Sequence, residues 1–561
     1  MLAAIVILIG VVVVSKVLRH MLAVVVMSMA VVFAFAIAPG TARAADTGAI
    51  TVDGTVATRY DAYQLFSATV VDDADADQKV ATDVVWANDT VRQAALPVLH
   101  DAGLDNSAST AQEAAEWMDA DGHMTTALTA KLARSLQSSG AESVALSAGR
   151  AAELPCGYWL IVADDDAIAQ GEAGTAPIMA LVGGGAVTVK PKAATPKVSK
   201  HVLEDGTAAW QKAADATVAD DLYWRLSATV PAGLAAYDTY TVRFVDTMSA
   251  GLDPSKVAAS MRVYVAAGAD GSFDAVSANK DGRAGTEPAK GWTDITAQCR
   301  VSTDGKTFTV RTGDLIAALG GADAFTAGAR VVAVYNAPLN SACNHGIAKG
   351  NPNQVYLRYP RSPLADQSGD AGFTRTPSDD ACAYTWGLSL IKRSSSDDKP
   401  LAGAKLRIID DRGRILTTDG SWSTDADACV TTGADGHVEL SGVDAGLYTV
   451  EEVAAPKGYT AFEGKRTVTV ASEGLDVKQV AAAKPKVTVS AESPLRVDTA
   501  DAGTGSIELS VLNTPSKEAS RGFMPSTGDR TLVLVAVLAA IGVAAIVVAL
   551  VIKRGAGRGE K

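Results

Sequence analysis

The chain has 561 residues, which is too long for one ordinary domain and predicts three or four. Its formal net charge of −13 and pI of about 5.0 argue against a nucleic acid as partner. Aromatic residues make up only 6%, while alanine, valine, threonine, glycine and aspartate dominate. This composition suits extracellular all-β modules better than a cytosolic enzyme.

The first 44 residues have the pattern of an export signal. Two apolar stretches, 2–14 and 21–37, flank a basic segment, and the small-x-small tripeptide 42–44 follows the second stretch. Because this order is that of a secretory signal, we expect cleavage after Ala44 and exclude residues 1–44 from the fold. The first apolar stretch is explained by a start site downstream of Met1, by an unusually long signal, or by a transmembrane hairpin.

Three blocks follow in the mature chain. The first, 45–189, combines strand-like runs with one helix-prone section at 109–136. Segment 190–197 is rich in lysine and carries two prolines, which keep it extended. We interpret it as the joint between the first and second blocks. The blocks 198–381 and 382–515 show the period-two alternation of β-strands separated by turn residues. We therefore predict an all-β fold of tandem β-sandwich domains, with some helix in the first.

The C-terminal part predicts a membrane anchor. Residues 531–552 form an apolar run of 22 residues, long enough for a transmembrane helix, and the basic tail 553–561 is expected in the cytoplasm. The preceding linker, 516–530, contains the motif Met524-Pro525-Ser526-Thr527-Gly528.

This motif resembles the cell-wall sorting signal of Gram-positive surface proteins, Leu-Pro-x-Thr-Gly, with Met524 in the leucine position. Leucine and methionine have similar volume and apolarity, so an apolar sortase pocket accepts either. The alternative is a single-pass anchor preceded by an incidental loop.

Five cysteines lie in the exported part, where disulfides are permitted. Their spacings predict one disulfide in each of two domains, Cys299–Cys343 and Cys382–Cys429, and leave Cys156 as a buried thiol. No CxxC or CxxH spacing supports a metal site, and no cofactor is expected. The sequence also lacks HExxH, GxSxG and P-loop motifs, which argues against an enzyme.

The third block carries the most specific motif. Residues 446–459 resemble the pilin E-box, Tyr-x-Leu-x-Glu-Thr-x-Ala-Pro-x-Gly-Tyr, and the block resembles a Cna B-type immunoglobulin-like domain. Such domains form an internal Lys–Asn isopeptide bond. The resemblance implies a bond between Lys392 on the first strand and Asn513 on the last strand, promoted by the E-box acid Glu452.

The chemistry of these residue types agrees with this assignment. Desolvation favours the neutral amine of a buried lysine, which is a nucleophile, whereas an ammonium group is not. A buried carboxylic acid likewise keeps its proton, so it can polarise the amide carbonyl and transfer protons as ammonia leaves. The alternative is a surface lysine, a capping asparagine and a solvated glutamate.

The second block resembles the isopeptide-forming middle domain of fimbrial shaft subunits. The segments that carry the resemblance are 244–252, 335–340 and 350–357. It implies a bond from Lys200 to Asn353 with Asp246 as the acid, and Lys197 and Asn351 are the competing residues. The alternative for Asp246 is an ordinary turn-forming aspartate after a strand.

The joint between the first two blocks resembles the pilin motif, whose core is Tyr-Pro-Lys-Asn. Lys192 takes the lysine position, while Lys190 replaces tyrosine and Ala193 replaces asparagine. Lys192 is therefore the implied acceptor for polymerisation, with Lys190 and Lys197 as substitutes. The alternative is a basic interdomain linker.

Taken together, the resemblance implies a major shaft subunit of a sortase-assembled pilus, wall-anchored on the surface of a Gram-positive bacterium. A sortase would cut between Thr527 and Gly528 and join Thr527 to Lys192 of the next subunit. The implied partners are pilus-specific and housekeeping sortases, identical subunits, peptidoglycan, and a host or bacterial surface ligand. The alternatives are an accessory or basal pilin, a wall-anchored adhesin that does not polymerise, and a surface enzyme.

Overall fold

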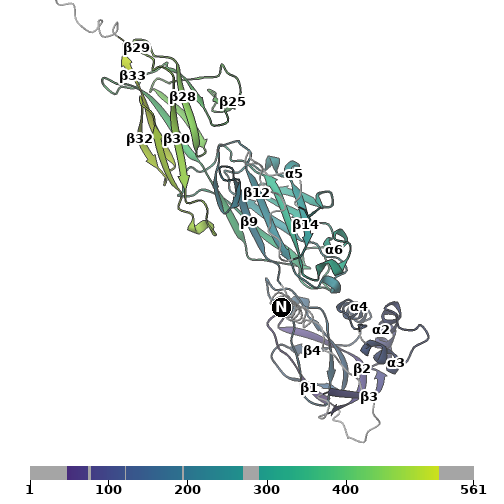
Figure 1. Cartoon of the computed structure of the whole chain (residues 1–561). Coiled ribbons are helices and arrows are strands. Elements are labelled where there is room, and N and C mark those ends of the chain that lie inside the picture. Colours follow the sequence, from purple (N-terminus) through teal and green to yellow (C-terminus); the bar gives the residue numbers. More distant parts are fainter. Residues whose placement is uncertain (1–46, 74–77, 121, 193–194, 269–289, 517–561) are drawn as a thin grey trace, which may run out of the picture.

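The computed structural model describes residues 47–73, 78–120, 122–192, 195–268 and 290–516. The signal region, the sorting motif and the apolar run 531–552 lie outside these residues. Three modules follow one another along an extended molecule (Figure 1). No helix within the described ranges has both the length and the apolarity needed to cross a membrane.

The first module packs two β-sheets. A three-stranded sheet has the order β5-β1-β8, and a five-stranded sheet has the order β3-β2-β6-β7 with β4 beside β2. Their bounds are β1 Thr47–Val52, β2 Arg59–Asp73, β3 Gln78–Trp86, β4 Val144–Ser147, β5 Ala152–Pro155, β6 Gly157–Ala163, β7 Ile178–Val182 and β8 Val187–Val189. Strand β6 is buried along its whole length, since both of its faces meet apolar side chains.

Three helices cover one side of the larger sheet (Figure 1). They are α2 Asp89–Asp101, α3 Ala111–Asp119 and α4 Thr126–Ser138. The single helix expected at 109–136 is thus two helices, because Thr110 and Thr125 each cap a separate N-terminus. Helix α2 was not predicted, although Asn88 caps it by accepting a hydrogen bond from the Val91 N–H.

The second module is a sandwich of two larger sheets. Their orders are β10-β9-β12-β18-β14-β15 and β11-β21-β19-β13-β17-β16, with β20 beside β19. The bounds are β9 Val198–Glu204, β10 Ala209–Gln211, β11 Ala213–Asp215, β12 Tyr223–Val230, β13 Arg243–Met248, β14 Arg262–Ala267, β15 Thr293–Asp294, β16 Arg300–Asp304, β17 Thr307–Arg311, β18 Ala329–Asn336, β19 Asn351–Pro360, β20 Phe373–Arg375 and β21 Asp379–Tyr384. Two short helices, α5 Val257–Ser260 and α6 Leu315–Ala318, lie in its connections.

The third module is a smaller sandwich. One sheet has the order β27-β22-β33-β29 with β32 beside β33, and the other has the order β25-β24-β23-β28-β30-β31 with β26 beside β23. The bounds are β22 Trp386–Ser394, β23 Lys405–Ile409, β24 Ile415–Leu416, β25 Trp422–Ser423, β26 Val430–Thr431, β27 His437–Val443, β28 Gly446–Ala454, β29 Tyr459–Thr460, β30 Lys465–Glu473, β31 Lys486–Ala491, β32 Leu495–Asp501 and β33 Ser506–Pro515. Its first and last strands, β22 and β33, pair in parallel. The prediction of a mostly β, multi-domain sandwich chain is thereby confirmed.

The modules contact one another through polar residues. The Arg134 guanidinium of α4 donates to Asp238 Oδ1 at 2.9 Å and to the Pro363 carbonyl at 3.0 Å. Between the second and third modules, Trp386 Nε1 donates to Asp215 Oδ2 at 2.9 Å. Strand β21 pairs with β19 and extends to Tyr384, so the second module continues a few residues beyond the boundary expected at 381.

Candidate functional site

The third module brings Lys392, Asn513 and Glu452 together in its core. Lys392 on β22 pairs with Val511 of β33, so Asn513 is its diagonal neighbour on the adjacent strand. Lys392 Nζ donates to Asn513 Oδ1 at 2.5 Å and lies 3.1 Å from Glu452 Oε1. Asn513 Nδ2 donates to the same Glu452 oxygen at 2.8 Å. One carboxyl oxygen on the facing sheet thus contacts both groups.

The environment of Lys392 favours its neutral amine. The side chain is fully buried, and this desolvation lowers its pKa to about 8, although the nearby Glu452 carboxyl acts in the opposite direction. The Phe462 ring lies 5.3 Å from Nζ, and the Phe462 N–H donates to Glu452 Oε2 at 3.0 Å. Phe462 therefore covers the amine and orients the acid at the same time.

The second module holds a corresponding group between its two sheets. Lys200 on β9 and Tyr335 on β18 come from one sheet, and Asp246 on β13 and Asn353 on β19 come from the other. All four side chains are fully buried. Lys200 Nζ forms an ion pair with Asp246 and also donates to the Tyr335 hydroxyl at 2.7 Å.

Burial shifts the pKa values of Lys200 and Asp246 in the directions that favour their uncharged forms. Desolvation lowers the pKa of Lys200 to about 8 and raises that of Asp246, while their mutual attraction opposes both shifts. The Trp224 ring lies 5.4 Å from Lys200 Nζ and adds to the apolar surroundings. The amine is therefore more nucleophilic here than in water.

The two competing residues of the second module have other surroundings. Asn351 is buried, but its Oδ1 accepts from the Asn344 N–H at 2.9 Å and its Nδ2 donates to the Asn344 carbonyl at 2.9 Å. Asn351 therefore holds the preceding loop. Lys197 is exposed at the start of the module. Asn353, in contrast, donates through Nδ2 to the Tyr335 hydroxyl beside Lys200.

The joint residues are open to solvent. Lys190 and Lys192 are both exposed between β8 and β9, with Val189 paired to Val52 on β1. An amine acceptor for another protein must be accessible, and both lysines meet this condition. The sorting motif 524–528, the other half of the expected linkage, lies outside the described residues.

The predicted disulfides are not formed. Cys299, Cys343, Cys382 and Cys429 are free thiols, so the pairs Cys299–Cys343 and Cys382–Cys429 were wrong. Cys382 lies on β21 of the second module, whereas Cys429 precedes β26 of the third. Burial raises the pKa values of Cys299 and Cys382 to about 11 and keeps both thiols protonated. Cys156 is buried, as expected.

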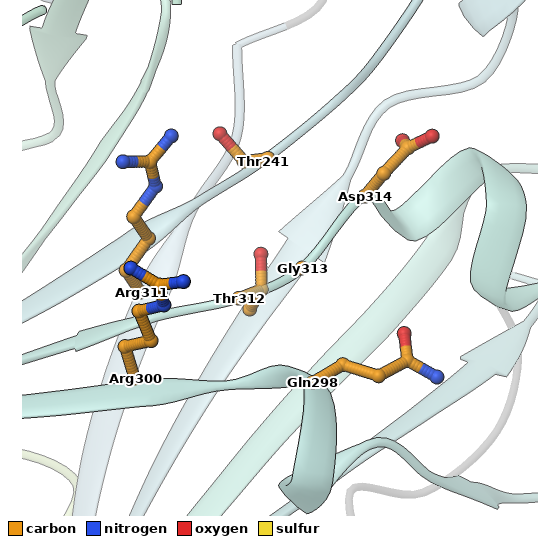
Figure 2. Close-up of a pocket in the computed structure, with 7 residues that line it drawn as sticks. All are labelled: Thr241, Gln298, Arg300, Arg311, Thr312, Gly313 and Asp314. Atoms are coloured by element: carbon orange, nitrogen blue, oxygen red, sulfur yellow. The ribbon is translucent and has the colours of Figure 1, made fainter. Parts of the chain in front are cut away.

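A surface hollow of about 400 Å³ opens in the second module (Figure 2). It is lined by Thr241, Gln298, Arg300, Arg311, Thr312, Gly313 and Asp314. Arg300 and Arg311 pair directly across β16 and β17. Asp314 caps α6 by accepting from the Ile316 N–H at 3.1 Å. The seven lining residues include no nucleophile beside a base, so the hollow does not have the make-up of a hydrolytic active site.

Sequence reasoning missed three aromatic residues of these clusters. Trp224 and Tyr335 lie beside Lys200, and Phe462 lies beside Lys392. Tyr335 opens a segment that resembles the fimbrial middle domain, but nothing in the sequence says that its hydroxyl meets Lys200. That contact depends on the strand order of one sheet, in which β9 and β18 both lie beside β12 although they are far apart in the sequence.

Residues 387–484 match the family described as the SpaA prealbumin-like fold domain. The third module is similar to SpaA prealbumin-like domains. The match covers strands β22 to β30 and includes both Lys392 and the E-box acid Glu452. The expected kinship with Gram-positive pilins, carried by the E-box resemblance, is thereby confirmed.

Among sequence relatives, the trypsin-resistant surface T6 protein of Streptococcus pyogenes serotype M6 is 28% identical over 134 residues. These residues are 22% of this chain and 23% of that protein, so the match spans less than a quarter of the curated relative. The relative is named as a surface protein and not as an enzyme, in agreement with the expectation that this chain is not an enzyme.

Solved structures of similar kind include the T6 backbone pilin of S. pyogenes, with 14% identity and a TM-score of 0.45, covering 84% of this chain and 98% of that one. The full-length major pilin SpaD of Corynebacterium diphtheriae has 15% identity and a TM-score of 0.40 over the same shares. The major pilin BcpA of Bacillus cereus has 12% identity and a TM-score of 0.37, covering 84% of this chain and 99% of that one.

Proposed function

We propose that this chain is the structural shaft subunit of a covalently polymerised pilus. The observation that carries the proposal is the buried contact of Lys392 with Asn513 and Glu452, in a module of the SpaA family. A lysine with no covalent role is expected at the surface, because burying a charged amine in a core costs free energy. Adhesion and wall attachment belong to the same proposal.

The first chemical step is an internal bond in each of two modules. The neutral Lys392 amine attacks Cγ of Asn513, the bond from Cγ to Nδ2 breaks, and ammonia leaves, with Glu452 moving the proton from one nitrogen to the other. Lys200, Asn353 and Asp246 carry out the same reaction in the second module. Each bond ties a first strand to a late strand, so tension along the shaft passes through covalent bonds.

The second step joins subunits. A sortase cuts the peptide bond between Thr527 and Gly528, forms an acyl-enzyme at Thr527, and transfers that acyl group to the exposed Lys192 amine of another subunit. Repetition gives a head-to-tail polymer, and a housekeeping sortase transfers the last Thr527 to peptidoglycan. The internal bonds need no external enzyme, whereas the links between subunits do.

Substitution of the acceptor tests this proposal. In cells with the cognate sortases, Lys192→Ala should leave export intact and abolish the high-mass ladder of wall material on denaturing gels. Lys190→Ala and Lys197→Ala serve as matched controls, since both remove an exposed lysine of the same joint. A ladder that persists in Lys192→Ala and disappears in one of the controls would move the acceptor. No ladder from the unsubstituted chain would favour an accessory pilin or a non-polymerising adhesin.

A further inference from the structure

The hydroxyl of Tyr335 lies at the centre of the second-module cluster. It accepts from Lys200 Nζ at 2.7 Å, donates to Asp246 Oδ2 at 3.0 Å, and accepts from Asn353 Nδ2 at 2.8 Å. A hydroxyl offers one donor and two acceptor positions, so all its hydrogen-bonding capacity is used on the three reacting side chains. Tyr335 is fully buried, and water has no access to it.

The two modules connect acid and amide differently. In the third module, Glu452 Oε1 contacts Lys392 and directly accepts from Asn513 Nδ2. In the second module, the amide nitrogen of Asn353 donates to Tyr335 instead. Aspartate is one methylene shorter than glutamate, so the phenol of Tyr335 occupies the position between the shorter acid and the amide.

Two buried oxygens of the second module support this difference. Asp246 Oδ1 and Asn353 Oδ1 accept no hydrogen bond from any residue that the structure describes. Unpaired buried polar atoms are costly and rare in folded proteins. Asn353 is therefore held through its amide nitrogen, and its carbonyl stays available to the acid and the attacking amine.

The ring of Tyr335 is fixed in place. It packs edge-to-face against Phe308 with ring centroids 4.8 Å apart. Burial raises the pKa of Tyr335 well above its ordinary value, with the Asp246 charge acting in the same direction. The phenol therefore keeps its proton until a neighbouring group exchanges it.

We infer that Tyr335 is a catalytic proton relay for the Lys200–Asn353 bond, an inference that rests on the proposed isopeptide chemistry. The reaction starts from a neutral Lys200 amine and a protonated Asp246. As Lys200 Nζ bonds to Asn353 Cγ, Asp246 gives its proton to the Asn353 carbonyl oxygen and takes one from Nζ. Rotation of one O–H bond directs the Tyr335 proton to Asn353 Nδ2. The bond from Cγ to Nδ2 breaks, ammonia leaves, Asp246 returns a proton to Tyr335, and the carbonyl oxygen returns its proton to Asp246. One proton has moved from Nζ to Nδ2, and both relay groups end as they began.

Removal of the hydroxyl tests the relay. The full chain with Tyr335→Phe is denatured and digested at fixed times after synthesis, and the joined peptides are quantified by mass spectrometry. We expect the Lys200–Asn353 peptide to fall at least tenfold while the Lys392–Asn513 peptide is unchanged. Tyr359→Phe is the matched control, because it removes another buried hydroxyl of the same module, one that donates to the Gly171 carbonyl at 2.8 Å.

A rescue variant separates chemistry from packing. In Tyr335→Phe combined with Asp246→Glu, the longer carboxyl can reach the amide as Glu452 does, so the Lys200–Asn353 peptide should return. An equal yield in Tyr335→Phe and the unsubstituted chain would overturn the relay, and so would a rescue variant that forms no bond. Absence of the joined peptide from the unsubstituted chain would instead overturn the proposed second-module bond itself.

Discussion

Lys392 Nζ lies 2.5 Å from Asn513 Oδ1, across two parallel strands that begin and end the third module. The two residues are 121 positions apart in the sequence. Their strands are neighbours in the sheet, so a covalent bond between the two residues would close a loop that contains nearly the whole module.

Replacement of Lys392 should remove one crosslink and much of the stability of the third module. Lys392→Met keeps an apolar stem of similar length but has no amine, so Asn513 keeps its side-chain amide and no ammonia is released there. Loss of a closure of this length should lower the free energy of unfolding by about 4–5 kcal/mol, by analogy with disulfides. Urea denaturation and intact mass measure the two effects. Lys399→Met, an exposed lysine on the same module, is the control; equal stability of both variants would contradict the prediction.

The two buried asparagines of β19 should respond differently to substitution. Asn353→Ala should lose the Lys200 crosslink, so its mass deficit relative to its own unmodified sequence should be one ammonia smaller than that of the parent chain. Asn351→Ala should keep the crosslink but lower stability by about 1–3 kcal/mol, because the Asn344 backbone groups lose their partners. Peptide mapping and urea denaturation distinguish them. A crosslink that survives in Asn353→Ala and is lost in Asn351→Ala would reverse the assignment.

Stability should fall as pH rises through the neutral range, because acids are buried between the second and third modules. Burial raises the pKa of Glu204 to about 8 from an ordinary 4.5, and it shifts Asp215 and Asp444 in the same direction. Between pH 4.5 and about 8 the folded chain keeps a proton on Glu204 that the unfolded chain releases. The stability that is present below about pH 4.5 is therefore lost as the pH approaches 8.

Urea denaturation at pH 5, 6.5 and 8 measures this effect. The decrease should be smaller in Glu204→Gln, which cannot ionise, than in the parent chain. Glu439→Gln, at an exposed glutamate of the third module, is the control. A free energy of unfolding that rises steadily from pH 5 to pH 8 would contradict the assignment of protonated acids at this interface.

Reduction should leave the folded chain unchanged, because the cysteines of the second and third modules are free thiols. The melting temperature with and without dithiothreitol should agree, and the denatured protein should bind an alkylating reagent at these cysteines without prior reduction. A mass gain of about 2 Da on reduction, which signals one broken disulfide, would show that a bridge forms after all.

The sequence identified Lys392, Asn513 and Glu452 because a long local motif fixes the acid and because strand alternation indicates which side chains point inward. It could not identify Tyr335, whose role arises only where β18 faces β13 and β19 across the sandwich. Helix α2 was missed because it contains Pro97, and a proline inside a segment ordinarily argues against a helix. The disulfides were mispredicted because sequence spacing does not report distance, and Cys382 belongs to the module before the one expected.

The intact mass of the exported region, residues 45–520, under reducing and denaturing conditions tests the internal bonds most directly. Each Lys–Asn bond releases one ammonia, about 17 Da, so two bonds predict a mass about 34 Da below that of the unmodified sequence. A deficit of one ammonia would leave only one module crosslinked. A mass equal to that of the unmodified sequence would contradict the buried clusters as bond-forming sites and the shaft function that rests on them.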